Sequence, residues 1–149
     1  LYRARHGAVR AYARANGIDR IAVRSDHDRL GIVFAGKTAT DTRQALIDFG
    51  IGDEDLQRAG IRLLRLGLIY PVDDALIREF GAGLEQVIVA MQEGYLFVSS
   101  VSDGSSLGVV ADRRCDVGAV GYQMTLLVER VGAALSPSLV AELKASVLQ

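Results

Sequence analysis

The chain has 149 residues, of which 50% are hydrophobic and only two are prolines. This length suffices to bury one hydrophobic core and leaves little room for a second independent domain. Seventeen basic residues nearly balance eighteen acidic ones, so no overall positive field attracts nucleic acid or an anionic membrane surface. We therefore expect one globular domain, spanning 1–149, that binds neither nucleic acid nor membrane.

The apolar runs, such as residues 117–128, are interrupted by glycine and polar residues well before the roughly 18 residues that a membrane span needs. No pattern typical of a signal peptide opens the chain, which favours a cytoplasmic location. Cys115 is the single cysteine, so an internal disulfide and a four-thiolate iron–sulfur or zinc site within one chain are excluded. The sequence predicts no metal site and no cofactor.

The N-terminal stretch, 1–29, predicts a peripheral helix over residues 5–16 followed by a linker. The short apolar run 31–35 then predicts a buried parallel strand. Asp41 and Gln44 have the spacing of a capping box, which predicts that the next helix begins near Asp41.

An acidic turn at residues 53–55 predicts a brief helix, and the apolar run 61–69 predicts a second strand. Asp73 is expected to cap a further helix, and residues 87–91 form a third predicted strand. The side chains expected on the inner face of that helix are Leu76, Ile77 and Phe80. Strands that alternate with helices indicate right-handed crossovers and a parallel sheet over residues 30–92.

After residue 94 the pattern becomes antiparallel. Two β-rich runs, 95–101 and 106–110, flank an Asp-Gly pair that is typical of a hairpin. Apolar residues at helical spacing predict a helix over 116–134, and Ser136-Pro137 predicts the start of a last helix. The sequence thus predicts an α/β fold with a single mixed sheet, parallel in the first half, ending in an antiparallel hairpin and covered by helices.

The first half carries ordered runs that include LGIVFAGKT (30–38) and DTRQALIDFGI (41–51). Over residues 9–92 the chain resembles the central core domain of indolepyruvate and related 2-oxoacid ferredoxin oxidoreductases. The resemblance implies that other domains of the enzyme bind thiamine diphosphate, magnesium and cysteine-ligated clusters. The resemblance therefore implies a structural segment of such an enzyme, without catalytic residues of its own.

The second half, which contains VIVAMQEGYLFVSS (87–100), is similar over residues 86–149 to the C-terminal half of a bacterial roadblock/LC7 domain. This resemblance implies a non-catalytic dimerisation and scaffold module that forms a homodimer and contacts a small Ras-like GTPase. Together the two resemblances predict a composite domain. A segment of a 2-oxoacid ferredoxin oxidoreductase, and a recombined or designed chimera without biological function, stay open as alternatives.

Residues 31–38 match the letters of the phosphate-binding P-loop, with Gly31, Gly36, Lys37 and Thr38 at the defining positions. The four intervening residues are apolar, which favours a strand over a solvated loop, so the nucleotide site is a weak candidate. The acidic clusters at 53–55 and 73–74 are interpreted as helix caps rather than metal ligands.

The predicted helix 116–134 carries an apolar stripe that packs on the molecule's own sheet, on a second copy, or on both. Met124 and Leu127 lie at its centre. The full set of candidate interface residues is Val117, Val120, Gly121, Met124, Leu127, Val128 and Val131.

Overall fold

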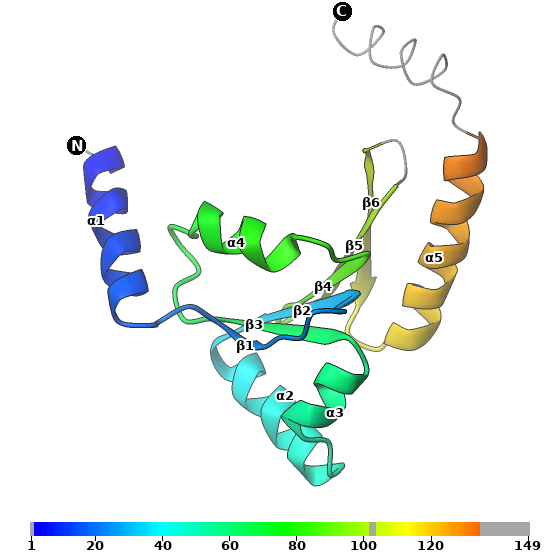
Figure 1. Cartoon of the computed structure of the whole chain (residues 1–149), viewed down its shortest axis with the longest axis horizontal. Coiled ribbons are helices and arrows are strands. Elements are labelled where there is room, and N and C mark those ends of the chain that lie inside the picture. The colour runs from blue at the N-terminus through cyan, green and yellow to red at the C-terminus, as the bar shows by residue number, and fades with distance from the viewer. Residues whose placement is uncertain (1, 102–103, 135–149) are drawn as a thin grey trace, which may run out of the picture.

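The computed structural model describes residues 2–101 and 104–134 (Figure 1). The elements in these ranges are α1 (Tyr2–Ala15), β1 (Arg20–Val23), β2 (Leu30–Ala35), α2 (Gly36–Asp48), α3 (Asp53–Arg58), β3 (Ile61–Leu66), α4 (Asp74–Gly81), β4 (Gln86–Ala90), β5 (Gly94–Ser100), β6 (Ser106–Asp112) and α5 (Val117–Ala134). The helix predicted from Ser136 lies outside the described residues.

Within the described residues the strands form one six-stranded sheet in the order β1-β3-β2-β4-β5-β6. The central strands β3, β2 and β4 are parallel, whereas β1 joins β3, β5 joins β4 and β6 joins β5 in antiparallel fashion. The prediction of an α/β fold with a single mixed sheet is confirmed.

Helices cover the two faces of this sheet unequally. The side chains of Phe34 and Leu63 pack with α2 and α3 on one face, and Ile88 and Phe97 pack with α5 farther along that face. Val33 and Leu64 pack with Phe80 of α4 on the opposite face. Because the central strands are covered on both sides, their sequences are continuous apolar runs rather than alternating ones.

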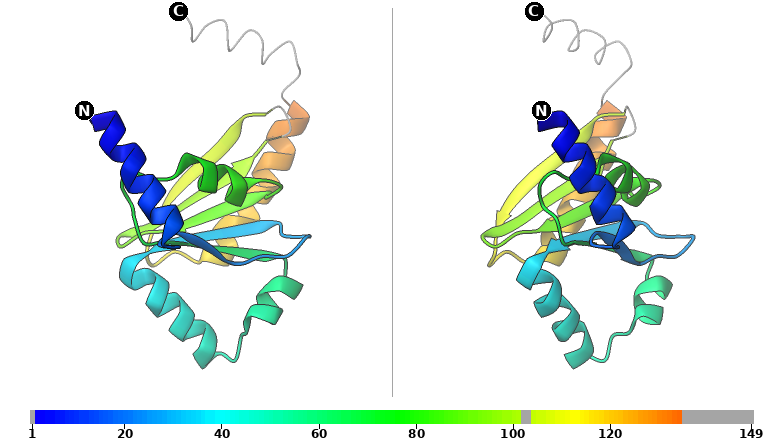
Figure 2. Two further views of the ribbon diagram at one scale, coloured as in Figure 1. Left: turned by 60° about the vertical axis from the view of Figure 1, so that its left-hand side comes forward. Right: turned by 90° about the vertical axis from the view of Figure 1, so that its left-hand side faces the viewer.

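α1 stands apart from these layers, and its N-terminal end points away from the sheet (Figure 2). Its C-terminal end is held near α4, where Ala13 is buried and Arg14 forms an ion pair with the buried carboxylate of Asp73. The predicted peripheral helix is thus confirmed.

Three expectations about the first half were wrong, two of them at the strand β1 and at the start of α2. Residues 20–23, interpreted as part of a linker, form the edge strand β1. α2 begins at Gly36 and not near Asp41, because Gly36 adopts a φ of +53°, which turns the chain directly from β2 into the helix. Asp41 accordingly lies inside α2, where it accepts a hydrogen bond from Lys37.

β3 ends at Leu66 and not at Ile69. The physical reason is Asp19, whose Oδ1 accepts hydrogen bonds from the backbone amides of Gly67 and Leu68 at 2.7 and 2.8 Å. These amides therefore bond to a side chain rather than to a neighbouring strand.

The helix caps expected from the acidic clusters are confirmed. Asp73 accepts a hydrogen bond from the backbone amide of Ala75, and Asp55 accepts one from Gly52 at the start of α3. On α4, Phe80 is buried as expected, whereas Ile77 is 36% exposed and so does not share the inner face fully. None of the described helices is both long and apolar enough to cross a membrane.

Candidate functional site

The P-loop-like residues lie along β2 and the first turn of α2. Gly31 is buried inside β2, where an added Cβ would meet Leu84 Cδ1 at 2.5 Å. The four apolar residues that follow it also belong to β2, and α2 starts immediately at Gly36. Lys37 forms an exposed ion pair with Asp41 at 3.1 Å. The structure therefore contains a direct strand-to-helix turn at this position, where a P-loop has a phosphate-wrapping loop between the two elements.

The apolar stripe of α5 packs largely on the chain's own sheet. Met124 is 3% exposed and contacts the cluster of Ile88 and Phe97, with Val117 and Val120 packed around it. Gly121 lies close to the side chain of Gln86, which donates a hydrogen bond to Ser99 Oγ. The remaining stripe residues are the partly buried Val128 and Val131 and the exposed Leu127. Intramolecular packing thus uses most of the predicted interface.

A buried ion pair that was not predicted connects β3 with the segment before β2 and the end of α4. Arg62 Nε donates to Asp28 Oδ2 at 2.8 Å, and the two side chains are 6% and 0% exposed. A second guanidinium nitrogen, Nη1, donates to the carbonyl oxygens of Phe80 and Ala82. Ser25 donates to both oxygens of Asp28 through its backbone amide and its hydroxyl. The pair therefore has the additional hydrogen bonds that a buried ion pair requires.

Burial alone would raise the pKa of Asp28. The hydrogen bonds from Ser25 and Arg62 outweigh that effect and hold the pKa of Asp28 below its usual value. The pair is consequently ionised at neutral pH and links three segments of the first half. A sequence signal for Arg62 exists, because an arginine inside the apolar run 61–66 is unusual for a buried strand.

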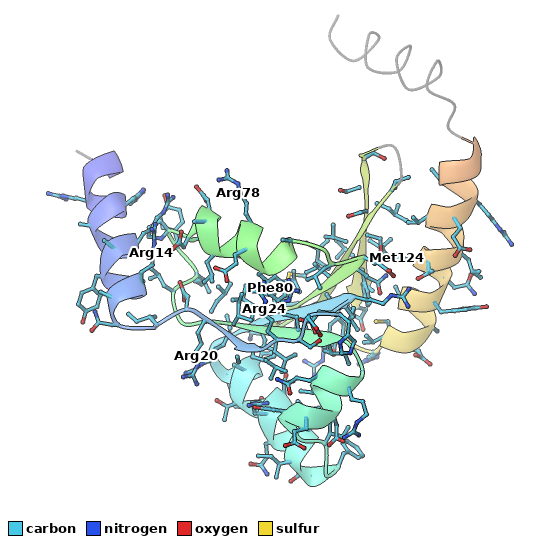
Figure 3. The ribbon with its side chains drawn as sticks, viewed as in Figure 1. Arg14, Arg20, Arg24, Arg78, Phe80 and Met124 are labelled. Carbon is cyan, nitrogen blue, oxygen red and sulfur yellow. The ribbon has the colours of Figure 1, made fainter. Side chains whose placement is uncertain are left out.

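A basic cavity opens on the face of the sheet that α2 covers. Its volume is about 240 Å³. Arg20 of β1 and Arg65 of β3 face each other as register partners, and Arg43 of α2 completes the set of three guanidinium groups. The other lining residues are Ala22, Phe34, Ala39 and Thr40. Figure 3 places Arg20 beside α2, whereas Arg78 lies on α4 at the opposite face of the sheet.

The charges around this basic cavity are only partly balanced. Arg43 binds both carboxylate oxygens of Asp53, a bond that lowers the pKa of Asp53. Among the residues that the structure describes, Arg20 and Arg65 have no ion-pair partner, and no carboxylate lines the cavity. The cavity was missed in the sequence because its arginines come from three separated segments.

A second cavity, of about 230 Å³, lies between α1 and α4. It is lined by acidic side chains, namely Asp19, Asp73 and Glu79, with Arg14 beside them. The carboxylate of Asp73 is neutralised by Arg14, and Glu79 pairs with Arg24. Each of these acidic groups thus has a structural partner, apart from one oxygen of Asp19.

β6 forms one edge of the sheet over the part of the chain that the structure describes. Along this strand the exposed residues alternate with partly buried ones, and Val110 is 75% exposed. Leu107, Val109 and Ala111 point toward α5. The unpaired backbone groups of such an edge are available to another strand.

Fold and surface together define an α/β domain whose apolar core is built around a central parallel sheet. The family model for the indolepyruvate ferredoxin oxidoreductase middle domain matches residues 19–98, more than half of the chain, and the chain belongs to this family. No curated protein and no solved structure matches the chain. Because the family match ends within β5, the roadblock/LC7 resemblance of residues 86–149 stays a prediction.

Proposed function

We propose that the chain is a non-catalytic middle domain that associates with the thiamine- and cluster-bearing parts of an indolepyruvate or related 2-oxoacid ferredoxin oxidoreductase. The observation that carries this proposal is the family match, which includes β1 to β4, most of β5 and all of α2, α3 and α4. The matched segment thus contains the whole parallel centre of the sheet, together with the helices that cover it.

Exposed apolar side chains at the far end of α2 support an association role. Ile47 is 67% exposed, Phe49 at the C-terminal end of the helix is 82% exposed, and Ile51 follows at 38%. These three side chains lie within five residues of one another, and apolar groups gathered on a surface mark sites of association. We assign this surface, residues 47–51, to contact with the rest of the enzyme.

The test combines the purified chain with an indolepyruvate ferredoxin oxidoreductase from which the middle domain has been deleted. We expect a complex by light scattering and a gain in indolepyruvate-dependent ferredoxin reduction. Phe49→Asp should abolish the complex, because a charge would have to be buried at its centre. Leu127→Asp, at an exposed position on α5, is the matched control and should leave the complex intact. Absence of a complex at micromolar concentrations would contradict the proposal.

A second candidate function is self-association, which the open edge of β6 favours. Val101 and Ser105 form a hydrogen-bonded pair near the hairpin tip. Because hydrogen-bonded pairs alternate along an antiparallel ladder, every second residue of β6 bonds to β5. The backbone amides and carbonyls of Gly108 and Val110 therefore face the open side of the strand. A second copy of β6 can then pair antiparallel with the first, with a two-fold axis at Val109. Gly108 of each copy would lie opposite Val110 of the other. With strands about 4.8 Å apart, the two α5 helices would lie side by side on the same face.

Light scattering over an approximately hundredfold range of protein concentration tests this dimer, because mass action exposes real association. Val110→Lys places like charges next to the two-fold axis and should yield a monomer. Ile47→Lys, an exposed substitution far from β6, should leave the molar mass unchanged.

The roadblock resemblance adds a small Ras-like GTPase as partner. Retention of a purified bacterial Ras-like GTPase by the dimer, and not by Val110→Lys, would support that addition.

A further inference from the structure

We propose that the basic cavity lined by Arg20, Arg43 and Arg65 binds a phosphate group, either as inorganic phosphate or as part of a small phosphorylated molecule. The cavity lies between β1, β3 and α2, and its floor is formed by the buried side chains of Phe34 and Ala39. This inference is independent of the proposed association surface at residues 47–51.

The first observation is the position of two like charges. Arg20 and Arg65 are direct cross-strand partners, an arrangement that destabilises a sheet because the guanidinium groups repel each other. Neither arginine has an ion-pair partner among the residues described. An anion bound between the two groups would convert this repulsion into attraction.

The second observation is the beginning of α2. Its N-cap residue is Ala35, which offers no side-chain oxygen, and its first turn contains no acidic residue. The amide groups at a helix N-terminus carry partial positive charge and attract anions. Ala39 and Thr40, near this end of the helix, line the cavity. The cavity thus lies within about one helical turn of the positive end of α2, whose first residues, 36–38, do not line it.

The third observation concerns the shape of the ligand. A carboxylate is satisfied by one guanidinium group in a bidentate pair, as Arg43 shows with Asp53. Here Arg43 is engaged by Asp53, whereas the two guanidinium groups of Arg20 and Arg65, from β1 and β3 and unpaired within the described part of the chain, approach the same cavity, which Thr40 also lines. A phosphate group carries more oxygens and more charge than a carboxylate, so it matches this donor set better.

Thermal unfolding in the presence of millimolar inorganic phosphate tests the inference, with sodium chloride at equal ionic strength as the reference. We expect phosphate to raise the Tm of the wild-type chain, and acetate to have a smaller effect. The double variant Arg20→Gln/Arg65→Gln should lose most of this increase. Arg78→Gln, on the opposite face of the sheet (Figure 3), is the matched control and should retain it.

The Tm measured without phosphate shows whether Arg65 serves to bind phosphate or to stabilise the sheet. Without phosphate, Arg65→Gln should have a higher Tm than the wild type, because the repulsion with Arg20 is removed. Calorimetric titration with inorganic phosphate and with a phosphomonoester then distinguishes the two sources: tighter binding of the phosphomonoester would indicate that its organic part contacts Phe34 and Ala39, and tighter binding of inorganic phosphate would indicate the free ion. An equal phosphate effect on the wild type and the double variant would overturn the inference, as would no phosphate effect on the wild type.

Discussion

The sheet from β1 to β4 and the hairpin of β5 and β6 are stabilised in different ways. The first region has helices on both faces, and polar contacts such as Arg62 with Asp28 and Arg14 with Asp73 connect its segments. Among the residues that the structure describes, the second region has a helix, α5, on one face only. On the other face, Val110 is 75% exposed and its register partner Leu96 is only partly buried.

This difference separates a region that helices cover on both faces from one that is covered on one face and ends in an open strand edge. The boundary also follows the family match, which ends within β5. The parallel centre therefore lies within the family match, whereas β6, with its open edge, and α5 lie outside it. Substitutions in each region can show whether the two regions unfold together or separately.

The largest effect is expected for Arg62→Ala. The substitution leaves the carboxylate of Asp28 buried without its cationic partner, which typically costs about 3–5 kcal/mol of unfolding free energy. It also removes the hydrogen bonds to the carbonyls of Phe80 and Ala82. Chemical denaturation measures the loss.

A matched control is Arg58→Ala, which breaks the exposed pair with Asp55 and should cost about 0–1 kcal/mol. Hydrogen exchange measured on the Arg62→Ala variant sharpens the comparison of regions. Loss of protection should be greatest in β2, β3 and α4. If β6 and α5 lose protection equally, the two regions form one cooperative unit.

Met124→Ala should destabilise the second region. Met124 is 3% exposed and fills the contact between α5 and Phe97, so its truncation should cost about 2–5 kcal/mol. Exchange should accelerate in α5, β5 and β6, while β2 and β3 stay protected. Leu127→Ala, on the exposed side of α5, should change stability by no more than about 0.5 kcal/mol. Equal effects of the two substitutions would contradict the observed packing.

Acid should weaken the first region through Asp28. Because hydrogen bonds and Arg62 lower the folded-state pKa of this carboxyl despite its burial, its contribution is complete above the unfolded value of about 3.9. The contribution is lost as the pH falls through the folded-state pKa. Unfolding free energy measured from neutral pH downward should therefore decrease more steeply for the wild type than for Asp28→Asn. Identical pH profiles would exclude Asp28 as a source of the acid sensitivity.

Gly31→Ala tests how tightly the first region is packed. The added Cβ would lie 2.5 Å from Leu84 Cδ1 and 2.7 Å from Phe80 Cζ, and such overpacking typically costs about 1–3 kcal/mol. The control lies in β6, where a Cβ on Gly108 has no closer neighbour than the carbonyl oxygen of Phe97 at 4.0 Å. Gly108→Ala should stabilise by up to about 1 kcal/mol. The opposite ranking in a thermal unfolding experiment would break the distinction between a packed and an open region.

Much of the fold could be predicted because local signals and tertiary packing agree. The buried run 31–35, the cap at Asp73 and the antiparallel hairpin each appear in the sequence at the right place. The strand β1 could not be predicted in this way, since it has four residues and is defined by its pairing with β3.

The candidate sites were less predictable than the fold. Arg20 and Arg65 become neighbours only when β1 pairs with β3, so no local pattern indicates a basic cavity. The predicted start of α2 near Asp41 was wrong because Asp41 and Gln44 have the spacing of a capping box without forming one. The helix begins earlier, at Gly36, whose backbone adopts a left-handed conformation. Arg62 and Arg65 both stand out in the sequence as charges within an apolar strand, but the pattern does not tell the buried Arg62 from the exposed Arg65.

The smallest expected effect concerns the repulsion between Arg20 and Arg65. Like charges directly opposite each other in a sheet cost roughly 0.2–1 kcal/mol, so Arg65→Gln should raise the unfolding free energy by about that amount at low salt. The gain should shrink as salt increases, because both arginines are exposed and their repulsion is screened. Denaturation at two ionic strengths measures this dependence. A gain that does not change with salt would indicate that Arg65→Gln acts through packing, and the edge of the first region would then be free of electrostatic strain.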